Sequence, residues 1–303
     1  MTPEEEKTAR DALRAIPALA GYSGPIERLG GLTNKVYRVG DHVLRIPGQG
    51  TEEYINRENE AVSAGVAAKA GVSPAVIHAD PKTGVMVTVL VPDAVTMSPD
   101  GFRSRKGSPA RAGQVFRKLH TSGGTFPFRF ELFAMIDDYL KVLATKDVEL
   151  PEGYHDVVRE ADAVRAALAR APLPLVPCHC DPLCENFIDD GTRMWVVDWE
   201  YSGMNDPHWD LGDLSVEAGM DEGQESELLR GYFGRDPTPA ERGRVVIYKA
   251  MCDLLWTLWG VIQHVNGNPA DDFWAYATGR FERCRALMDR PDYQAHLDAI
   301  LAG

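Results

Sequence analysis

The chain has 303 residues, of which 44% are hydrophobic, and its formal net charge at pH 7 is −13. This length and composition suffice for one large or two smaller domains with a substantial core. The uniform acidity disfavours nucleic acids and anionic membrane surfaces as partners, because both carry charge of the same sign.

The amino-terminal stretch predicts a helix and not a secretion signal. Thr2 can act as the N-cap, Pro3 occupies the first turn and Glu5 completes a capping box. The basic region and apolar run of a signal peptide are absent. The chain contains five cysteines, three of them clustered, which do not make a disulfide framework and which fit a reducing cytoplasm.

The first hundred residues favour a β-rich region with one helix. The runs "KVYRV" and "HVLRI" flank Gly40 and Asp41, an arrangement typical of a hairpin. A helical pattern follows over roughly residues 53–70, and two further strand-like runs come next, "AVIHA" and "VMVTVLV". With a short strand before the hairpin, the predicted order is β-β-β-α-β-β.

Beyond residue 92 the pattern becomes mainly helical. The stretch "CHCDPLCENF" and a short strand, "MWVVDW", interrupt the helices. The most apolar later segment contains Lys249, Asp253 and Gln263, which predicts a buried helix and not a membrane span. We expect two lobes, residues 1–91 and 92–303, with a ligand site in the cleft between them.

The cysteine-rich stretch admits two interpretations. Its possible zinc ligands are Cys178, His179, Cys180 and Cys184. Three of these are consecutive, and adjacent side chains rarely converge on one tetrahedral ion. The alternative is a phosphotransferase loop, because His179, Asp181 and Asn186 have the spacing of the kinase catalytic loop.

Asp198 provides a further part of such a loop. Phosphoryl transfer needs a carboxylate near the attacking hydroxyl, a neutral oxygen ligand for Mg²⁺ and an anionic metal ligand from a nearby strand end. Asp198 ends an apolar run twelve residues after Asn186, and a hairpin between them would bring the two side chains together. This combination favours a phosphotransferase over a zinc protein.

On these motifs the sequence resembles the choline/ethanolamine kinase family, within the larger group that includes the aminoglycoside phosphotransferases. The resembling segments are "GGLTNKVYRV", "VLRIPGQGTEEYINRENE", "CHCDPLCENFIDD", "VVDWEYSGMNDPHWDLGDLSVEAG" and "LLWTLWGVIQ". They span nearly all of the chain in the family's order. The resemblance implies an α+β, two-lobed, protein-kinase-like fold, with a small β-rich N-terminal lobe and a larger, mainly helical C-terminal lobe. The protein-kinase motifs G-x-G-x-x-G, V-A-I-K and D-F-G are absent.

The resemblance also implies an ATP site in the N-terminal lobe. The residues expected there are Gly31, Thr33, Asn34, Arg45, Glu60, Val89 and Val91. The loop "GGLTN" would cover the phosphates, with glycines that allow close backbone approach. Arg45 would contact phosphate oxygens with its fork of donors and pair with Glu60, or alternatively with Glu58. Backbone groups of the two valines would meet the adenine.

For the acceptor, the resemblance implies a cage for a cationic alcohol. The expected residues are Tyr201, Glu217, Trp256, Trp259 and Tyr276. Choline carries a permanent cation that cannot donate a conventional hydrogen bond, so aromatic rings and a carboxylate are the usual means of binding it. Trp256 and Trp259 are three positions apart, which places them on one helix face. Such a pair also suits a simple helix core, and the kinase motifs are what favour the cage.

We therefore expect a cytoplasmic choline kinase that uses ATP and Mg²⁺. Asp181 would orient the substrate hydroxyl and accept its proton, while Asn186 and Asp198 would hold the metal. His179 would orient the loop and Asp210 would support it. The alternatives are a kinase for ethanolamine, thiamine or an aminoglycoside, and a catalytically silent binding module.

Overall fold

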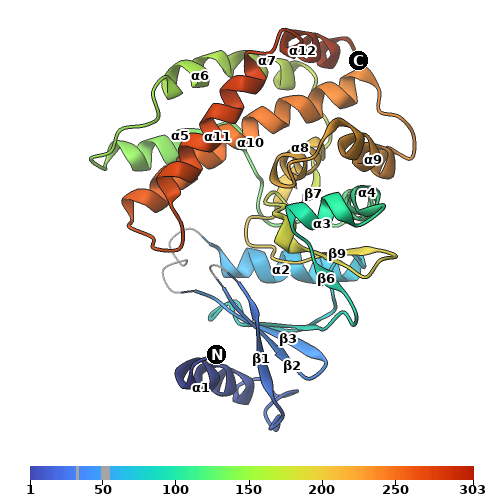
Figure 1. Ribbon diagram of the computed structural model, residues 1–303, viewed down its shortest axis with the longest axis vertical. Helices are drawn as coiled ribbons and strands as arrows, with labels where there is room; N and C mark the ends of the chain where they lie inside the picture. Colours follow the sequence, from blue (N-terminus) through green and yellow to red (C-terminus); the bar gives the residue numbers. More distant parts are fainter. Residues whose placement is uncertain (32–33, 49–54) are drawn as a thin grey trace.

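The computed structural model describes residues 1–31, 34–48 and 55–303. Figure 1 shows a small part that contains a sheet, drawn in blue at the bottom, below a larger and mainly helical part. The α+β organisation expected from the sequence is confirmed.

The smaller part is built on a five-stranded antiparallel sheet with the spatial order β1-β2-β3-β5-β4. Its elements are α1 (Pro3–Arg14), β1 (Ile26–Gly30), β2 (Lys35–Val39), β3 (His42–Ile46), α2 (Arg57–Lys69), β4 (Val76–Ala79) and β5 (Met86–Val89). The predicted order β-β-β-α-β-β is confirmed. The capping box of α1 is also present, since the Glu5 N–H donates to Thr2 Oγ1 and the Thr2 N–H donates to Glu5 Oε2.

Helix α2 begins later than its sequence pattern suggested. Asn56 is its N-cap and accepts a hydrogen bond from the Asn59 N–H at 3.0 Å, so the first helical residue is Arg57. Residues 53–54 of the predicted range lie outside the described residues. The side chain of an N-cap satisfies a backbone donor that the helix leaves open, which is why the helix starts here.

The chain passes from the first sheet to a second one after β5. Strand β6 (Val95–Thr96) pairs with β8 (Phe187–Asp189), and β8 pairs with β9 (Met194–Val196). The lobe boundary that we propose after residue 91 thus falls between a strand of one sheet and a strand of the other.

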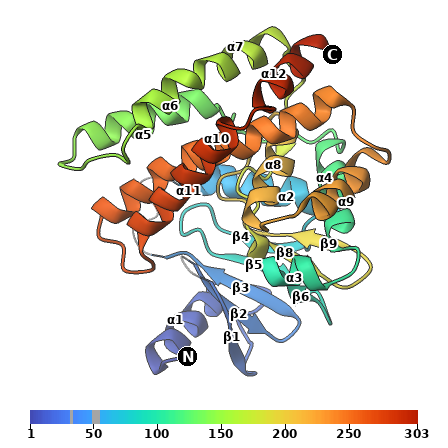
Figure 2. The same ribbon diagram turned by 45° about the horizontal axis from the view of Figure 1, so that its top comes forward.

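The larger part packs its helices around α10. Its helices are α3 (Pro99–Ser104), α4 (Ser108–His120), α5 (Leu132–Ala144), α6 (Tyr154–Glu160), α7 (Asp162–Arg170), α8 (His208–Glu217), α9 (Glu222–Phe233), α10 (Pro239–Val265), α11 (Phe273–Met288) and α12 (Tyr293–Ala302). Strand β7 (Val176–Cys178) leads into the stretch "CHCDPLCENF" and pairs with β10 (Gly203–Asn205), which follows the β8–β9 hairpin. Helices α5, α8, α11 and α12 all contact α10, as Figure 2 shows for α11 lying along it.

Helix α10 is long and apolar enough, by length and composition, to cross a membrane. In the described part of the chain it is the one helix with this property, and 78% of its most apolar window is buried inside the protein. A capping box of Thr238 and Glu241 and a proline at the first turn start the helix. This burial agrees with the prediction of a buried helix, which was based on the polar residues that interrupt the apolar segment.

Candidate active site

The stretch "CHCDPLCENF" connects β7 to β8, and its backbone is hydrogen-bonded to the side chain of Asp210 on α8. Asp210 is fully buried and accepts hydrogen bonds from the N–H groups of His179 and Cys180, both at 2.8 Å. Cys180 has a φ of 68°, in the left-handed region that residues other than glycine rarely adopt. The two hydrogen bonds therefore fix a strained backbone immediately before Asp181. Nε2 of His120 lies 3.0 Å from the same carboxylate.

The imidazole of His179 lies inside the protein beneath the loop. Its Nε2 is 2.9 Å from the carbonyl oxygen of Val197, and its ring centroid is 4.9 Å from that of Trp199. Burial lowers the pKa of His179, so the ring is neutral and donates to the carbonyl. This geometry suits a residue that ties the loop to the strand leading to Asp198.

The three loop cysteines are buried, and their sulfur atoms face different neighbours. Cys178 Sγ lies 3.6 Å from Asn205 O, whereas Cys180 Sγ lies 3.7 Å from Cys178 O. Burial raises the pKa of all three thiols, and zinc binds the thiolate form. Among the described residues, the potential metal-ligand group that includes a loop cysteine combines Cys178 with His120 and Asp210, and Asp210 already accepts from the loop backbone. The cysteines are best explained as packing residues.

A hairpin brings Asn186 and Asp198 together. Strands β8 and β9 pair in antiparallel fashion, and the N–H of Val197 donates to the carbonyl oxygen of Asn186 at 2.9 Å. The Asn186 side-chain amide donates to the carbonyl oxygen of Asp181 at 3.0 Å, so its Oδ1 is the end left for a metal ion. Asp198 has a φ of 67°, a second strained backbone in the site.

The carboxyl groups of this loop have unusual protonation equilibria. Burial, followed by the charges of Glu217 and Asp198, raises the pKa of Asp181 to about 8. Burial and the charge of Glu200 raise the pKa of Asp198 to about 7, with Arg45 acting in the opposite direction. Perturbed carboxyl groups of this kind are concentrated at functional sites.

Two arginines of the smaller part bind three carboxylates next to the loop. Arg45 forms an ion pair with Glu60, and its Nη1 donates to Asp198 Oδ1 at 2.9 Å. Arg57 donates to Glu60 Oε2 at 2.9 Å and to Glu200 Oε1 at 2.5 Å. The sequence reasoning anticipated Arg45 and Glu60 and missed Arg57 and Glu200. The sequence did contain a signal for both: Arg57 lies three residues before Glu60 on the same predicted helix, and Glu200 lies two residues after Asp198.

The glycine-rich loop reaches the same carboxylates through Asn34. Its Nδ2 donates to Glu200 Oε1 at 3.0 Å, and Asp198 Oδ2 lies 3.5 Å away. Gly31 has a φ of 100°, and a Cβ at this position would lie 2.0 Å from the carbonyl oxygen of Asn34. A side chain is therefore excluded at Gly31. Thr33, also expected in this loop, lies outside the described residues.

The two valines expected near the adenine lie at the end of β5. The Val89 N–H donates to Ala75 O at 2.9 Å, and the N–H of Leu90 donates to Asp41 O at 2.9 Å. An adenine that contacted the backbone of Val89 would therefore have to bind the carbonyl oxygen of Val89, because the N–H group is already used. The side chain of Val89 is exposed.

The four aromatic residues expected around the acceptor form one connected cluster. The rings of Tyr201 and Trp256 are 5.5 Å apart and edge to face, and Trp259 Nε1 donates to the Tyr201 hydroxyl at 3.2 Å. The rings of Trp259 and Tyr276 are 5.7 Å apart. Trp256 is buried, whereas the other three rings are half-buried. The structure thus brings residues of three separate segments together.

Glu217 lies at this cluster but is already ion-paired. Its carboxylate accepts from the buried guanidinium of Arg280, whose other side donates to Asp253 at 3.1 Å. Arg280 also lies over the ring of Tyr276, 4.9 Å from the centroid. Arg283 completes the chain of charges by donating to Asp253 at 2.7 Å. The sequence reasoning missed Arg280 and Asp253.

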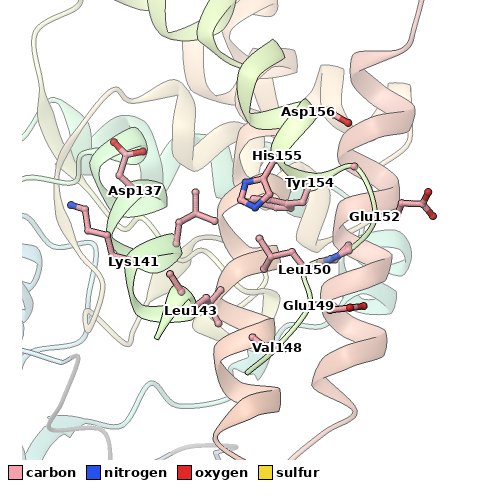
Figure 3. Close-up of a pocket in the computed structure, with 14 residues that line it drawn as sticks. Asp137, Lys141, Leu143, Val148, Glu149, Leu150, Glu152, Tyr154, His155 and Asp156 are labelled. Carbon is pink, nitrogen blue, oxygen red and sulfur yellow. The ribbon is translucent and has the colours of Figure 1, made fainter. Parts of the chain in front are cut away.

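A separate hollow of about 860 Å³ lies between α5, α6 and the segment that connects them. Figure 3 shows Asp137 and Lys141 on one side of it and Leu150 on the other. The hollow contains none of the residues of the catalytic loop, the arginine network or the aromatic cluster.

Comparisons with known proteins agree with this arrangement. Residues 26–245 match the model of a phosphotransferase enzyme family. A structure of a choline/ethanolamine kinase family protein from Mesorhizobium loti is 68% identical, with a TM-score of 0.93 over 98% of this chain and 99% of that one. The choline kinase LicA from Streptococcus pneumoniae is 26% identical, with a TM-score of 0.78 over 94% of this chain and 99% of that one. Ethanolamine kinase 2 of Homo sapiens is also 26% identical, over 84% of this chain and 73% of its own length.

Proposed function

Because this chain belongs to the choline/ethanolamine kinase family of phosphotransferases, with the kinase-like fold of that family, we propose that it is a choline kinase. It would transfer the terminal phosphoryl group of ATP to the hydroxyl of choline and release phosphocholine and ADP. Its relatives support a kinase that acts on a small amino alcohol, and choline is our choice within that class.

The aromatic cluster carries this choice. The rings of Tyr201, Trp256, Trp259 and Tyr276 adjoin one another. Burial raises the pKa of Tyr276, and the charges of Glu217 and Asp181 raise it further, so both acids lie near this ring. A trimethylammonium group is large, weakly hydrated and attracted to ring faces, at roughly 0.5–2 kcal/mol per contact. A cation held at these rings would have its hydroxyl within reach of the catalytic loop.

In the reaction, Asp181 would orient the substrate hydroxyl and accept its proton. Its raised pKa makes the ionised form a stronger base than an ordinary aspartate. Asp210 would hold the loop in shape through its two backbone hydrogen bonds. Most of the rate enhancement would come from positioning and from electrostatic stabilisation.

Asn186 and Asp198 fit a magnesium ion, since an amide oxygen and a carboxylate are the hard oxygen donors that this metal prefers. When bound, Mg²⁺ would neutralise charge on the phosphate oxygens. Arg45 would exchange its contact with Asp198 for a contact with the nucleotide phosphates. We also place the protein in the cytoplasm, because all five of its cysteines are free and buried.

The second candidate is ethanolamine kinase. It is favoured by the human ethanolamine kinase 2, whose identity to this chain equals that of the choline kinase LicA. A primary ammonium would require hydrogen-bond acceptors in place of ring faces.

A substrate panel tests the proposal. The purified protein is incubated with ATP and Mg²⁺ and with choline, ethanolamine, thiamine or an aminoglycoside, and ADP release is followed. The highest kcat/KM is expected for choline. A clearly higher value for ethanolamine or thiamine would remove the choline assignment while leaving the phosphotransferase assignment in place.

A further inference from the structure

Asp213 is a buried acid of the acceptor site to which the reaction described above gives no role. It lies four positions before Glu217 on α8, so both side chains share one helix face. The residue is 1% exposed. One carboxyl oxygen accepts from Trp256 Nε1 at 3.3 Å, and the other oxygen is buried without a hydrogen-bond partner among the described residues.

In the described part of the chain, no ion pair joins Asp213 to a cation. The groups that face it are Asp181 and Cys180 on the catalytic loop, Glu217 on its own helix, Cys252 and Trp256 on α10, and Tyr276 and Arg280 on α11. The cation among them, Arg280, is ion-paired with Glu217 and Asp253. A buried carboxylate next to two other acids and without a cation of its own is costly.

This environment favours the neutral form of the Asp213 carboxyl group. Burial, followed by the charge of Glu217, raises the pKa of Asp213 well above its ordinary value.

We propose that Asp213 balances the charge of the substrate's cationic head group. Its carboxyl group is neutral in the free protein and ionises when the cation enters the aromatic cluster. The O–H bond of the carboxylic acid breaks, the proton leaves to solvent, and the carboxylate remains opposite the bound cation. This inference rests on the proposed function, because it requires a cationic acceptor alcohol.

The contact with Trp256 explains how a buried acid can act without touching the substrate. The indole N–H donates to Asp213, so the carboxyl group contacts the edge of a ring that belongs to the aromatic cluster. A carboxylate that accepts this N–H increases the electron density of the ring and so its attraction for a cation. Glu217 is less suited to this role, since Arg280 already balances its charge.

Calorimetric titration of choline tests the proposal. The titration is repeated near neutral pH in two buffers with different ionisation enthalpies. The number of protons released per choline bound follows from the difference between the two measured binding enthalpies. For the wild type we expect about one proton released per choline bound. The neutral isostere 3,3-dimethylbutan-1-ol should release none, because it brings no charge.

The variant Asp213→Asn keeps an oxygen that accepts from Trp256 Nε1 but cannot ionise. We expect it to bind choline without proton release and roughly tenfold more weakly, as a loss of one pKa unit of coupling implies, and to bind the neutral isostere as the wild type does. Asp138→Asn is the matched control, since it removes one negative charge from an exposed position on α5; its choline binding and proton release should not change.

Four results would overturn the proposal. Proton release that persists in Asp213→Asn would assign the proton to another group, and unchanged choline affinity in that variant would leave Asp213 with the structural role of holding Trp256. Phosphorylation of choline by a wild type that binds choline without proton release would reject the role of Asp213 and keep the proposed function. A wild type that neither binds nor phosphorylates choline would reject both.

Discussion

Asp181 and Asp198 are two residues at which the fold strongly alters ordinary side-chain chemistry. The pKa values of their carboxyl groups rise to about 8 and about 7, because both are removed from water and lie near other acids. Each is also tied to strained backbone, at Cys180 next to Asp181 and at Asp198 itself. Such costs are tolerated where a site needs a group in one position and one protonation state.

The variant Asp181→Asn tests the role of the base. It should lose phosphoryl transfer almost completely while nucleotide binding remains, because the amide cannot accept the hydroxyl proton. In the wild type, kcat/KM for choline should rise with pH up to about 8, as Asp181 ionises. Near-normal turnover of the purified variant would contradict the assignment.

The same variant should be more stable than the wild type at high pH. The folded pKa of Asp181 lies above the ordinary value of 3.8, so the folded protein holds a proton that the unfolded chain releases. The stability linked to that proton is complete below about pH 4 and is lost as the pH rises to about 8. At pH 8 we expect Asp181→Asn to melt at least about 2 °C higher than the wild type, and the difference should shrink toward pH 5. A variant that melts lower at pH 8 would show that the carboxylate is well compensated.

Among the elements, α10 combines two tasks that its sequence pattern does not separate. One face fills the core against α8, α11 and α12, and the positions of Trp256 and Trp259 extend that face to the aromatic cluster. Trp256 is buried, and Trp259 is half-buried between Tyr201 and Tyr276. Of the two, Trp259 can thus be changed with less damage to the core.

Trp259→Ala should raise the KM for choline much more than the KM for ATP, because it removes one ring face and leaves the arginine network intact. A rise of about tenfold is expected from the size of one cation–π contact. Trp274→Ala is the matched control, since Trp274 lies on α11 against His264. Equal effects of both variants on the choline KM would return the tryptophan pair to a core role.

The loop before β2 depends on one glycine. A methyl group at Gly31 would meet the Asn34 carbonyl oxygen at 2.0 Å, and the φ of 100° is itself unfavourable for alanine. Gly31→Ala should therefore displace Asn34 from Glu200 and raise the KM for ATP severalfold with little effect on choline. The control is Gly65→Ala, a helical position in α2 with open space, where alanine should be neutral or stabilise by about 0.5–1 kcal/mol. An unchanged ATP KM in Gly31→Ala would argue against a nucleotide role for this loop.

At the scale of the whole molecule, charged residues connect the small part to the large one. Asn34, Arg45 and Arg57 come from the first sheet and α2, and all three donate to Glu200 Oε1 of the larger part. Arg57 pairs with both Glu60 and Glu200, so under the proposed function Arg45 could turn toward phosphates and leave neither acid without a cation.

Arg57→Gln tests this connection. Loss of the Arg57 guanidinium should lower the free energy of unfolding by about 3 kcal/mol, the usual cost of removing one partner of a buried ion pair. The variant should also bind nucleotide more weakly when binding is measured in the presence of EDTA. In the double variant with Glu200→Gln, both effects should be smaller than in Arg57→Gln alone, because the acid is removed together with its cation. If the second change restores stability but not nucleotide binding, Arg57 contacts the phosphates directly.

The sequence alone determined the features that depend on neighbours along the chain. The capping box at Thr2, the β-β-β-α-β-β order of elements along the first part of the chain and the hairpin that joins Asn186 to Asp198 follow from short-range hydrogen bonds, residue patterns and turn chemistry. Tertiary structure decided the charge pairing, because it is packing that brings distant acids and bases together. Arg57 and Glu200 are 143 positions apart, and Arg280 and Glu217 are 63 apart. The pairing of Glu217 with Arg280 and the unpaired state of Asp213 depend on where α8, α10 and α11 meet, which no local pattern specifies.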